Sequence, residues 1–201
     1  MFIITADQID STHTEDLAGN VVAALNARYG SRLTLPVDRN AGDEIQALTS
    51  DPQTTLAIIL ELTRTGRWSV GCGVGAVRSP LPRNTREAAG PAFVAARTAV
   101  ESAKRDPLHF ALQIDAAQSV ETARVAPLIE LLLLLRSRRT AQGWELFDLM
   151  ANGETQADAA DKLAISPQAA SQRARAAGIR TELASLPALA ALMADADRSA
   201  A

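Results

Sequence analysis

The segment at residues 155–178, TQADAADKLAISPQAASQRARAAG, contains start signals for two short helices joined by a tight turn. Thr155 is a favourable N-cap residue, and Asp158 stands three positions later, where an acidic side chain stabilises a helix N-terminus. Ser166 followed by Pro167 starts the second helix, because the first helical N–H needs no intrahelical partner and proline fits there. The pattern predicts a helix-turn-helix at residues 155–178.

The second of these helices separates small from polar residues. Ala170, Ala174 and Ala177 recur at i, i+4 and i+7 and predict an inward face. Arginine pairs with guanine edges or phosphates, glutamine with adenine edges, and serine with phosphates, so the outward residues suit DNA. The expected DNA-binding residues are Ser166, Gln168, Ser171, Gln172, Arg173 and Arg175. The simpler alternative is an alanine-rich hairpin with a solvated basic face.

The turn departs from the common pattern, which places glycine where this chain has Ala164. A left-handed backbone at a residue other than glycine costs roughly 1 kcal/mol.

Composition limits the kinds of partner. The 201 residues carry a net charge of −3, so any attraction to DNA must be local. Cys72 is the single cysteine, which excludes an intramolecular disulfide and a multi-cysteine metal site. The start FIITADQID has no basic leader, and apolar runs such as residues 131–135 are too short to span a bilayer. We therefore expect a cytoplasmic protein that does not bind membranes.

The order of local signals predicts an α+β protein. Strands are expected near residues 2–9, 33–37, 44–48, 68–77 and 108–114, and helices near 14–29, 51–65 and 87–104. The first six elements have the order of a ferredoxin-like split βαβ sheet. Because strand signals stop after Asp115, we expect a ferredoxin-like domain at residues 1–115, an all-α domain at 116–194, and a tail at 195–201.

Three expectations concern the helical region. Pro127 is expected at a helix start, and Pro187 is expected to break or restart the last helix. The run at residues 131–135 is leucine on every face, which predicts burial on all sides, between the domains or in a dimer. A homodimer would place two recognition helices about one DNA turn apart.

Acidic residues of the first half point to a second site. Asp7 follows the first strand and Gly42-Asp43-Glu44 forms a hairpin tip, so we expect Asp7 and Asp43 to face one another and hold Mg²⁺. Glu44 is a further candidate ligand of the metal. The glycine-spaced strand WSVGCGVGAV, with Gly42, leaves room for a nucleotide, and Arg97 would meet its phosphates. The simpler alternative is a common Gly-Asp turn, a capping Asp7 and a surface Arg97.

Four motifs carry a family resemblance: ADQID, AGDEIQAL, VGCGVG and GPAFVAARTAV. They resemble the SatD-like family of bacterial proteins, and their pattern is similar to the catalytic core of class III nucleotide cyclases and diguanylate cyclases. The resemblance covers roughly residues 1–105. It implies that Asp7 and Asp43 bind metals on a nucleoside triphosphate and that Arg97 bears on the triphosphate. The chain departs from the cyclases at Phe93, where they have asparagine, and at Ala41, where the diguanylate cyclase signature has glycine.

These features favour a DNA-binding regulatory protein with a cyclase-like N-terminal domain that binds a nucleotide or mediates dimerisation. The alternative is a Mg²⁺-dependent nucleotidyl transferase or cyclase-type enzyme acting on a nucleoside triphosphate, so enzymatic activity stays open. A third possibility is an interaction module whose helices contact another protein.

Overall fold

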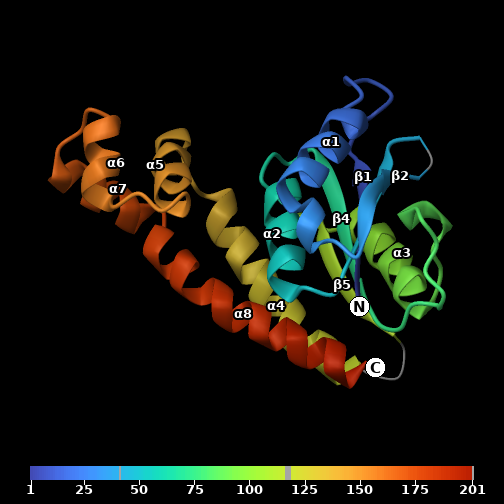
Figure 1. Cartoon of the computed structure of the whole chain (residues 1–201). Helices are drawn as coiled ribbons and strands as arrows, with labels where there is room; N and C mark the ends of the chain where they lie inside the picture. The colour runs from blue at the N-terminus through green and yellow to red at the C-terminus, as the bar shows by residue number, and fades with distance from the viewer. Residues whose placement is uncertain (41, 116–118, 201) are drawn as a thin grey trace. The chain divides into compact units, whose positions relative to one another are not determined.

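The chain folds as an α+β protein built on one five-stranded mixed sheet. The computed structural model describes the backbone of residues 1–40, 42–115 and 119–200, and the side chains of all of these except 119–123 (Figure 1). The strands are β1 (Phe2–Gln8), β2 (Leu35–Arg39), β3 (Glu44–Thr49), β4 (Trp68–Val74) and β5 (Phe110–Ile114). Their order across the sheet is β2-β3-β1-β4-β5. The β4–β5 pair is parallel and the other three pairs are antiparallel.

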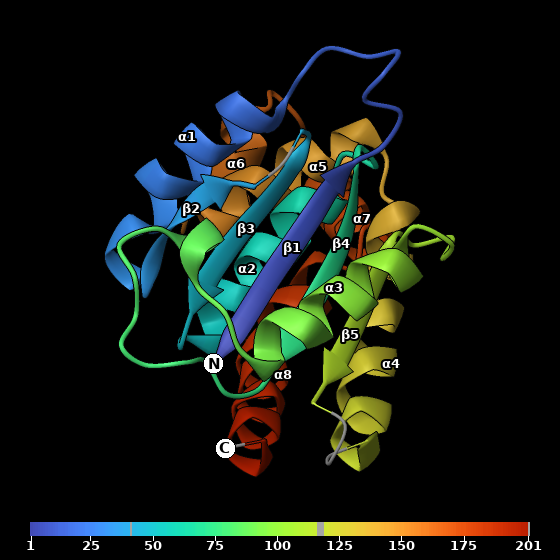
Figure 2. The same cartoon turned by 90° about the vertical axis from the view of Figure 1, so that its right-hand side faces the viewer.

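Helices cover both faces of the sheet. They are α1 (Ala18–Tyr29), α2 (Pro52–Thr63) and α3 (Pro91–Ala103), with 3-10 turns at Gly30–Arg32 and Thr85–Glu87. Figure 2 shows α2 behind the sheet and α3 in front of it. The predicted start of α2 is confirmed: the Asp51 carboxylate accepts hydrogen bonds from the backbone N–H groups of Gln53 and Thr54, and Pro52 occupies the first turn. Strong local capping therefore positions this helix.

Helix α3 packs directly onto the glycines of β4. A Cβ atom placed on Gly71 would lie 2.2 Å from the backbone nitrogen of Val100, and one on Gly73 would lie 2.2 Å from the carbonyl oxygen of Ala92. The expectation that this strand leaves room for a nucleotide is therefore wrong at Gly71 and Gly73, because the helix backbone fills that space. Glycine is needed here for the close approach of two backbones.

Two proline predictions are wrong. Pro127 lies inside α4 (Ser119–Ser137), and Pro187 lies inside α8 (Ile179–Ser199). An internal proline removes one helical hydrogen bond, but packing on both sides of it can hold the helix together. In α4 the buried residues Val125 and Ile129 flank Pro127, and in α8 Leu189 is buried two residues after Pro187.

The chain divides into two compact units, a sheet unit comprising Met1–Glu130 with Ala188–Ala201, and a helical unit comprising Leu131–Pro187. Both divisions fall inside a helix, at α4 and at α8. The predicted domain limits at residues 115 and 194 stay predictions. No helix in the described parts of the chain is long and apolar enough to cross a membrane.

The helical unit contains α5 (Ala141–Ala151), α6 (Gln156–Lys162) and α7 (Pro167–Ala176), with the end of α4 and the start of α8 (Figure 1). Its core is small and depends on a few large side chains packed among alanines. The buried members are Leu146, Phe147, Ala159, Ala174, Ala177 and Ile179.

The leucine run of α4 is only half covered. Leu132 and Leu133 are buried, whereas Leu131 is 64% exposed and Leu134 is 39% exposed. The single chain therefore does not bury this run on all sides, and burial in a dimer stays a prediction. Five consecutive leucines surround a helix, but neighbouring helices cover only part of its circumference. The predicted homodimer stays a prediction.

Candidate nucleic-acid interface and sheet-face pocket

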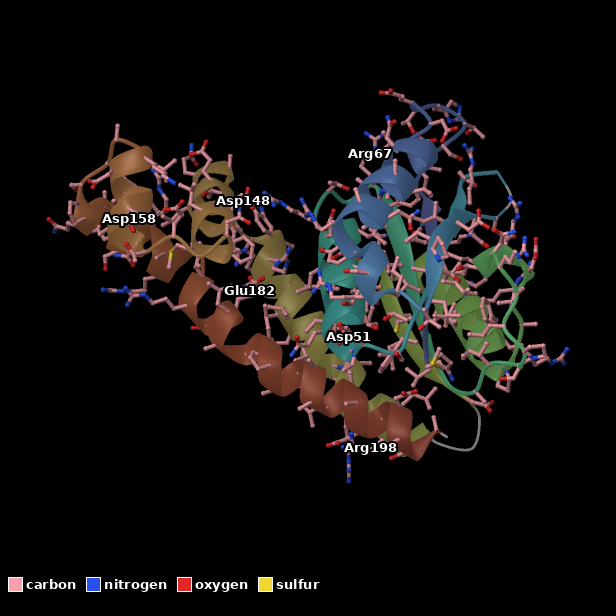
Figure 3. The ribbon with its side chains drawn as sticks, in the orientation of Figure 1. Asp51, Arg67, Asp148, Asp158, Glu182 and Arg198 are labelled. Atoms are coloured by element: carbon pink, nitrogen blue, oxygen red, sulfur yellow. The ribbon has the colours of Figure 1, made fainter. Side chains whose placement is uncertain are left out.

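The two helices at residues 155–178 begin at the predicted caps. The Thr155 hydroxyl oxygen accepts a hydrogen bond from the Asp158 backbone N–H at 3.2 Å, and the hydroxyl donates to the Asp158 carboxylate at 2.7 Å (Asp158 is labelled in Figure 3). The Ser166 hydroxyl oxygen accepts from the Ala169 N–H at 3.1 Å, and Pro167 occupies the first turn of α7. Each cap satisfies a backbone donor that the helix leaves unpaired, so the starts of both helices are fixed locally.

The turn between these helices contains the expected left-handed residue. Ala164 has φ = 52°, a conformation that favours glycine. The next residue closes the turn, because the Ile165 N–H donates to the Ala160 carbonyl at 3.0 Å. The turn therefore keeps its geometry with an alanine at a strained position.

Helix α7 buries its alanines and exposes most of its polar side chains. Ala170 and Ala174 are buried, as is Ala177 at the end of the helix, so the predicted inward face is confirmed. Of the expected DNA-binding residues, four are exposed and two are partly buried. The exposed ones are Ser166, Gln168, Gln172 and Arg175, and the partly buried ones are Ser171 and Arg173.

The two arginines of α7 differ in their surroundings. Arg173 lies against α5, where its Nη1 is 3.8 Å from the Glu145 carboxylate and 3.5 Å from the Gln142 carbonyl oxygen. Arg175 has no ion pair with any described residue, and its side chain is exposed. Arg175 is therefore the arginine of this helix that is best placed to meet a phosphate or a base.

A buried ionic cluster, which the sequence analysis missed, lies beside these helices. The Glu182 carboxylate, on the first turn of α8 (Figure 3), accepts from Arg136 through one oxygen and from Arg139 through the other, at 2.6 Å for Arg139. The Glu182 and Arg139 side chains are fully buried, and that of Arg136 is 7% exposed. The only sequence signal was two arginines three residues apart beside a leucine-rich helix.

The same cluster holds the end of α7. Arg139 donates from Nε and Nη2 to the carbonyl oxygen of Ala177, at 3.1 and 2.8 Å. The guanidinium carbons of Arg136 and Arg139 lie 4.6 and 4.4 Å from the centre of the Trp144 ring on α5. The cluster therefore ties α4, α5 and α8 to the C-terminus of α7.

Burial of these charges changes the electrostatics of the helical unit. Two arginines and one acid are withdrawn from the surface, which leaves equal numbers of other basic and acidic residues. The basic ones are Arg138, Lys162, Arg173, Arg175 and Arg180, and the acidic ones are Glu145, Asp148, Glu154, Asp158 and Asp161. Any affinity for DNA must therefore come from the local arrangement on α7, since the unit has no basic excess at its surface.

The expected metal ligands Asp7, Asp43 and Glu44 lie near one end of the β1–β3 pair. Asp7 lies opposite Glu44 in the β1–β3 pair, while Asp43 precedes β3 in the turn with Gly42. The Lys104 ammonium lies 3.0 Å from the Asp7 carboxylate. Burial lowers the pKa of Lys104, but its hydrogen bonds to Asp7 and Glu101 outweigh this and raise the pKa above its ordinary value. Asp7 is therefore held in an ion pair.

Within the described ranges, no group of three or more His, Cys, Asp and Glu side chains is placed to hold a metal ion. The expected Mg²⁺ and nucleotide stay predictions. Cys72 is not a candidate nucleophile, because burial raises the pKa of its thiol to about 12 and keeps it protonated at neutral pH.

A polar pocket of about 260 Å³ lies on the sheet face that α3 covers. Its walls come from the sheet, from the loop before α3 and from α3 itself. The lining residues are Thr5, Asn40, Glu44, Gln46, Arg86, Ala88, Phe93, Val94 and Arg97. Of the predicted site residues, the pocket brings together Glu44 and Arg97, while Asp7, Gly42 and Asp43 are not part of its lining.

The pocket also contains groups that the sequence analysis did not select. Thr5 and Gln46 are cross-strand partners, and alternation from Glu44 along β3 was the signal that would have found Gln46. Arg86 lies in the loop, where its Nε is 3.5 Å from the Asp38 carboxylate. Thr5 is only 1% exposed, and its hydroxyl oxygen has no hydrogen-bond partner among the described residues.

Comparison with protein-family models, curated proteins and solved structures finds no match to this chain. The resemblance to the SatD-like family and to the cyclases therefore rests on the four sequence motifs alone.

Proposed function

We propose that the chain is a DNA-binding regulatory protein in which α6, the turn and α7 form a helix-turn-helix and α7 contacts the major groove. The observation that carries this proposal is the exposed row Gln168, Gln172 and Arg175, on a helix with fixed caps and a buried alanine face. No acidic residue occurs between Pro167 and Arg180. Side chains of these types read base edges and phosphates.

For the sheet unit, we propose a ferredoxin-like, cyclase-related scaffold. The strand directions support this proposal, because β3 lies between β1 and β2 and is antiparallel to both, while β4 is antiparallel to β1. A split βαβ sheet has this arrangement. Membership of the SatD-like family remains part of the proposal.

The ion pair between Asp7 and Lys104 favours a regulatory function over nucleotidyl transfer. The enzyme hypothesis needs this carboxylate as a metal ligand, yet it is ion-paired with Lys104, and its cross-strand partner is Glu44 rather than Asp43. A metal would have to displace the ammonium group before the carboxylate could bind it.

The test is fluorescence anisotropy with a labelled DNA duplex, measured over a range of salt concentrations. Arg175→Ala should weaken binding and reduce the slope of log K against log [salt] by about 1, because one phosphate contact is lost. Arg138→Ala is the matched control, since Arg138 is an exposed arginine of the same unit outside α7. If Arg175→Ala binds DNA as the unchanged chain does, while its circular dichroism is unaltered, the assignment of α7 is wrong.

A further inference from the structure

The polar pocket on the sheet offers two kinds of unused hydrogen-bonding capacity. One is the Thr5 hydroxyl, which is buried without a partner among the described residues. Nearly all buried polar groups in native proteins are paired, because folding removes their hydrogen bonds to water. An orphaned hydroxyl in the wall of a pocket therefore points to a partner that is not part of the chain.

The second is the free oxygen of Glu44. Its Oε1 accepts from the side-chain amides of Asn40 at 2.6 Å and Gln46 at 3.3 Å, which hold the carboxylate in place. Its Oε2 has no partner among the residues that the structure describes. A ligand that donates a hydrogen bond, through a hydroxyl or amino group, would satisfy this oxygen.

Two arginines at the same pocket supply positively charged hydrogen-bond donors. Arg97, on α3, has no ion pair or hydrogen bond with any described residue. Arg86 lies 3.5 Å from the Asp38 carboxylate at Nε, and its terminal nitrogens form no hydrogen bond with a described residue. Guanidinium groups bind carboxylate and phosphate oxygens through paired hydrogen bonds. The arginines therefore favour a ligand with an oxyanion.

The volume of the pocket and its apolar wall indicate the size and the carbon skeleton of the ligand. The volume of about 260 Å³ is just below the roughly 300–1,000 Å³ of pockets for drug-sized molecules, which favours a small metabolite. Phe93 and Val94 give the pocket an apolar side that suits a short carbon skeleton. The nearby carboxylate of Asp7 is already neutralised by Lys104, so an oxyanion does not need a divalent cation to approach.

We propose that this pocket binds a small hydroxylated or aminated acid, with its carboxylate or phosphate at Arg97 and Arg86 and its donor groups at Glu44 and Thr5, and that binding needs no divalent metal. None of the residues that line the pocket belongs to α7, so the proposal does not rest on DNA binding.

Isothermal titration calorimetry of the full chain in EDTA tests binding at this pocket. The three probes share a five-carbon skeleton: ribose 5-phosphate, ribonate and neutral ribitol. We expect one of the two anions to bind in the millimolar range or more tightly and ribitol to bind at least tenfold more weakly. Preference for ribose 5-phosphate assigns a phosphate ligand, and preference for ribonate assigns a carboxylate. The proposal is overturned if neither anion binds, if ribitol binds equally well, or if binding appears only with Mg²⁺.

Two variants and one control assign the binding to this pocket. Arg97→Gln should reduce affinity roughly tenfold or more, because a charge-assisted hydrogen bond is lost. Thr5→Val, which keeps the shape and removes the orphaned hydroxyl, should weaken binding severalfold while the ligand-free chain keeps or gains thermal stability. Arg105→Gln, at an exposed arginine just after α3, should bind normally. Unchanged affinity in both pocket variants would place the ligand elsewhere and overturn the assignment.

Discussion

Removal of the Glu182 charge should strongly destabilise the helical unit. Glu182 forms ion pairs with two buried arginines, Arg136 and Arg139, and both of its oxygens are engaged. Loss of one member of a buried ionic cluster costs about 3–5 kcal/mol, because the remaining charges stay buried and uncompensated. Glu182→Gln leaves two guanidinium groups facing an amide. A unit of about 57 residues has a total stability of roughly 3–9 kcal/mol, so this loss removes a large part of it.

Tryptophan fluorescence can follow this unit by itself. The chain has two tryptophans, Trp144 on α5 and Trp68 on β4. In a Trp68→Phe background, urea unfolding monitored through Trp144 reports on the helical unit, with and without Glu182→Gln. The expected result is a free energy of unfolding that is lower by about 3–5 kcal/mol.

A second variant separates loss of charge from loss of packing. Replacing the whole cluster by apolar residues, as Arg136→Met, Arg139→Met and Glu182→Leu together, should restore much of the stability, since no buried charge remains. Recovery should be incomplete, because the Ala177 carbonyl loses its two donors from Arg139. A loss below about 1 kcal/mol for Glu182→Gln alone would refute the view that this cluster is a buried, mutually dependent network.

Two further predictions concern glycine positions and can be checked by thermal and urea unfolding. Ala164→Gly should stabilise the chain by about 0.5–1 kcal/mol, because it relieves a left-handed alanine at φ = 52°; a lower melting temperature would contradict the proposed strain. Gly73→Ala should destabilise it by about 1–3 kcal/mol or more, because the new Cβ would meet the Ala92 carbonyl oxygen at 2.2 Å. Gly19→Ala is the matched control, with open space around the added Cβ, and an equal loss there would contradict the close packing of α3.

Local features of the helix-turn-helix were predictable from the sequence. The caps at Thr155 and Ser166, the left-handed Ala164 and the inward alanines each depend on residues within one or two helical turns. The strands and the α+β class were predictable for a similar reason, since alternation and turn residues are local signals.

Features that depend on distant contacts were not predictable. On neighbouring strands, Asp7 lies opposite Glu44 rather than Asp43. The strand register decides which side chains are neighbours, and the sequence does not display it. Pro127 and Pro187 continue their helices because packing outweighs a local penalty. In the sequence, Arg139 is indistinguishable from an exposed arginine, and only the fold shows that it is buried against Glu182.

The measurement that tests the central claim most directly is selection of duplexes from a random-sequence DNA library by the full chain, repeated with a chain that carries Gln172→Ala and Arg175→Ala. We predict that the unchanged chain enriches a common sequence and that the variant, folded to the same extent by circular dichroism, loses that enrichment. Absence of any enriched sequence with the unchanged chain, or the same enrichment with the variant, would contradict sequence recognition by α7.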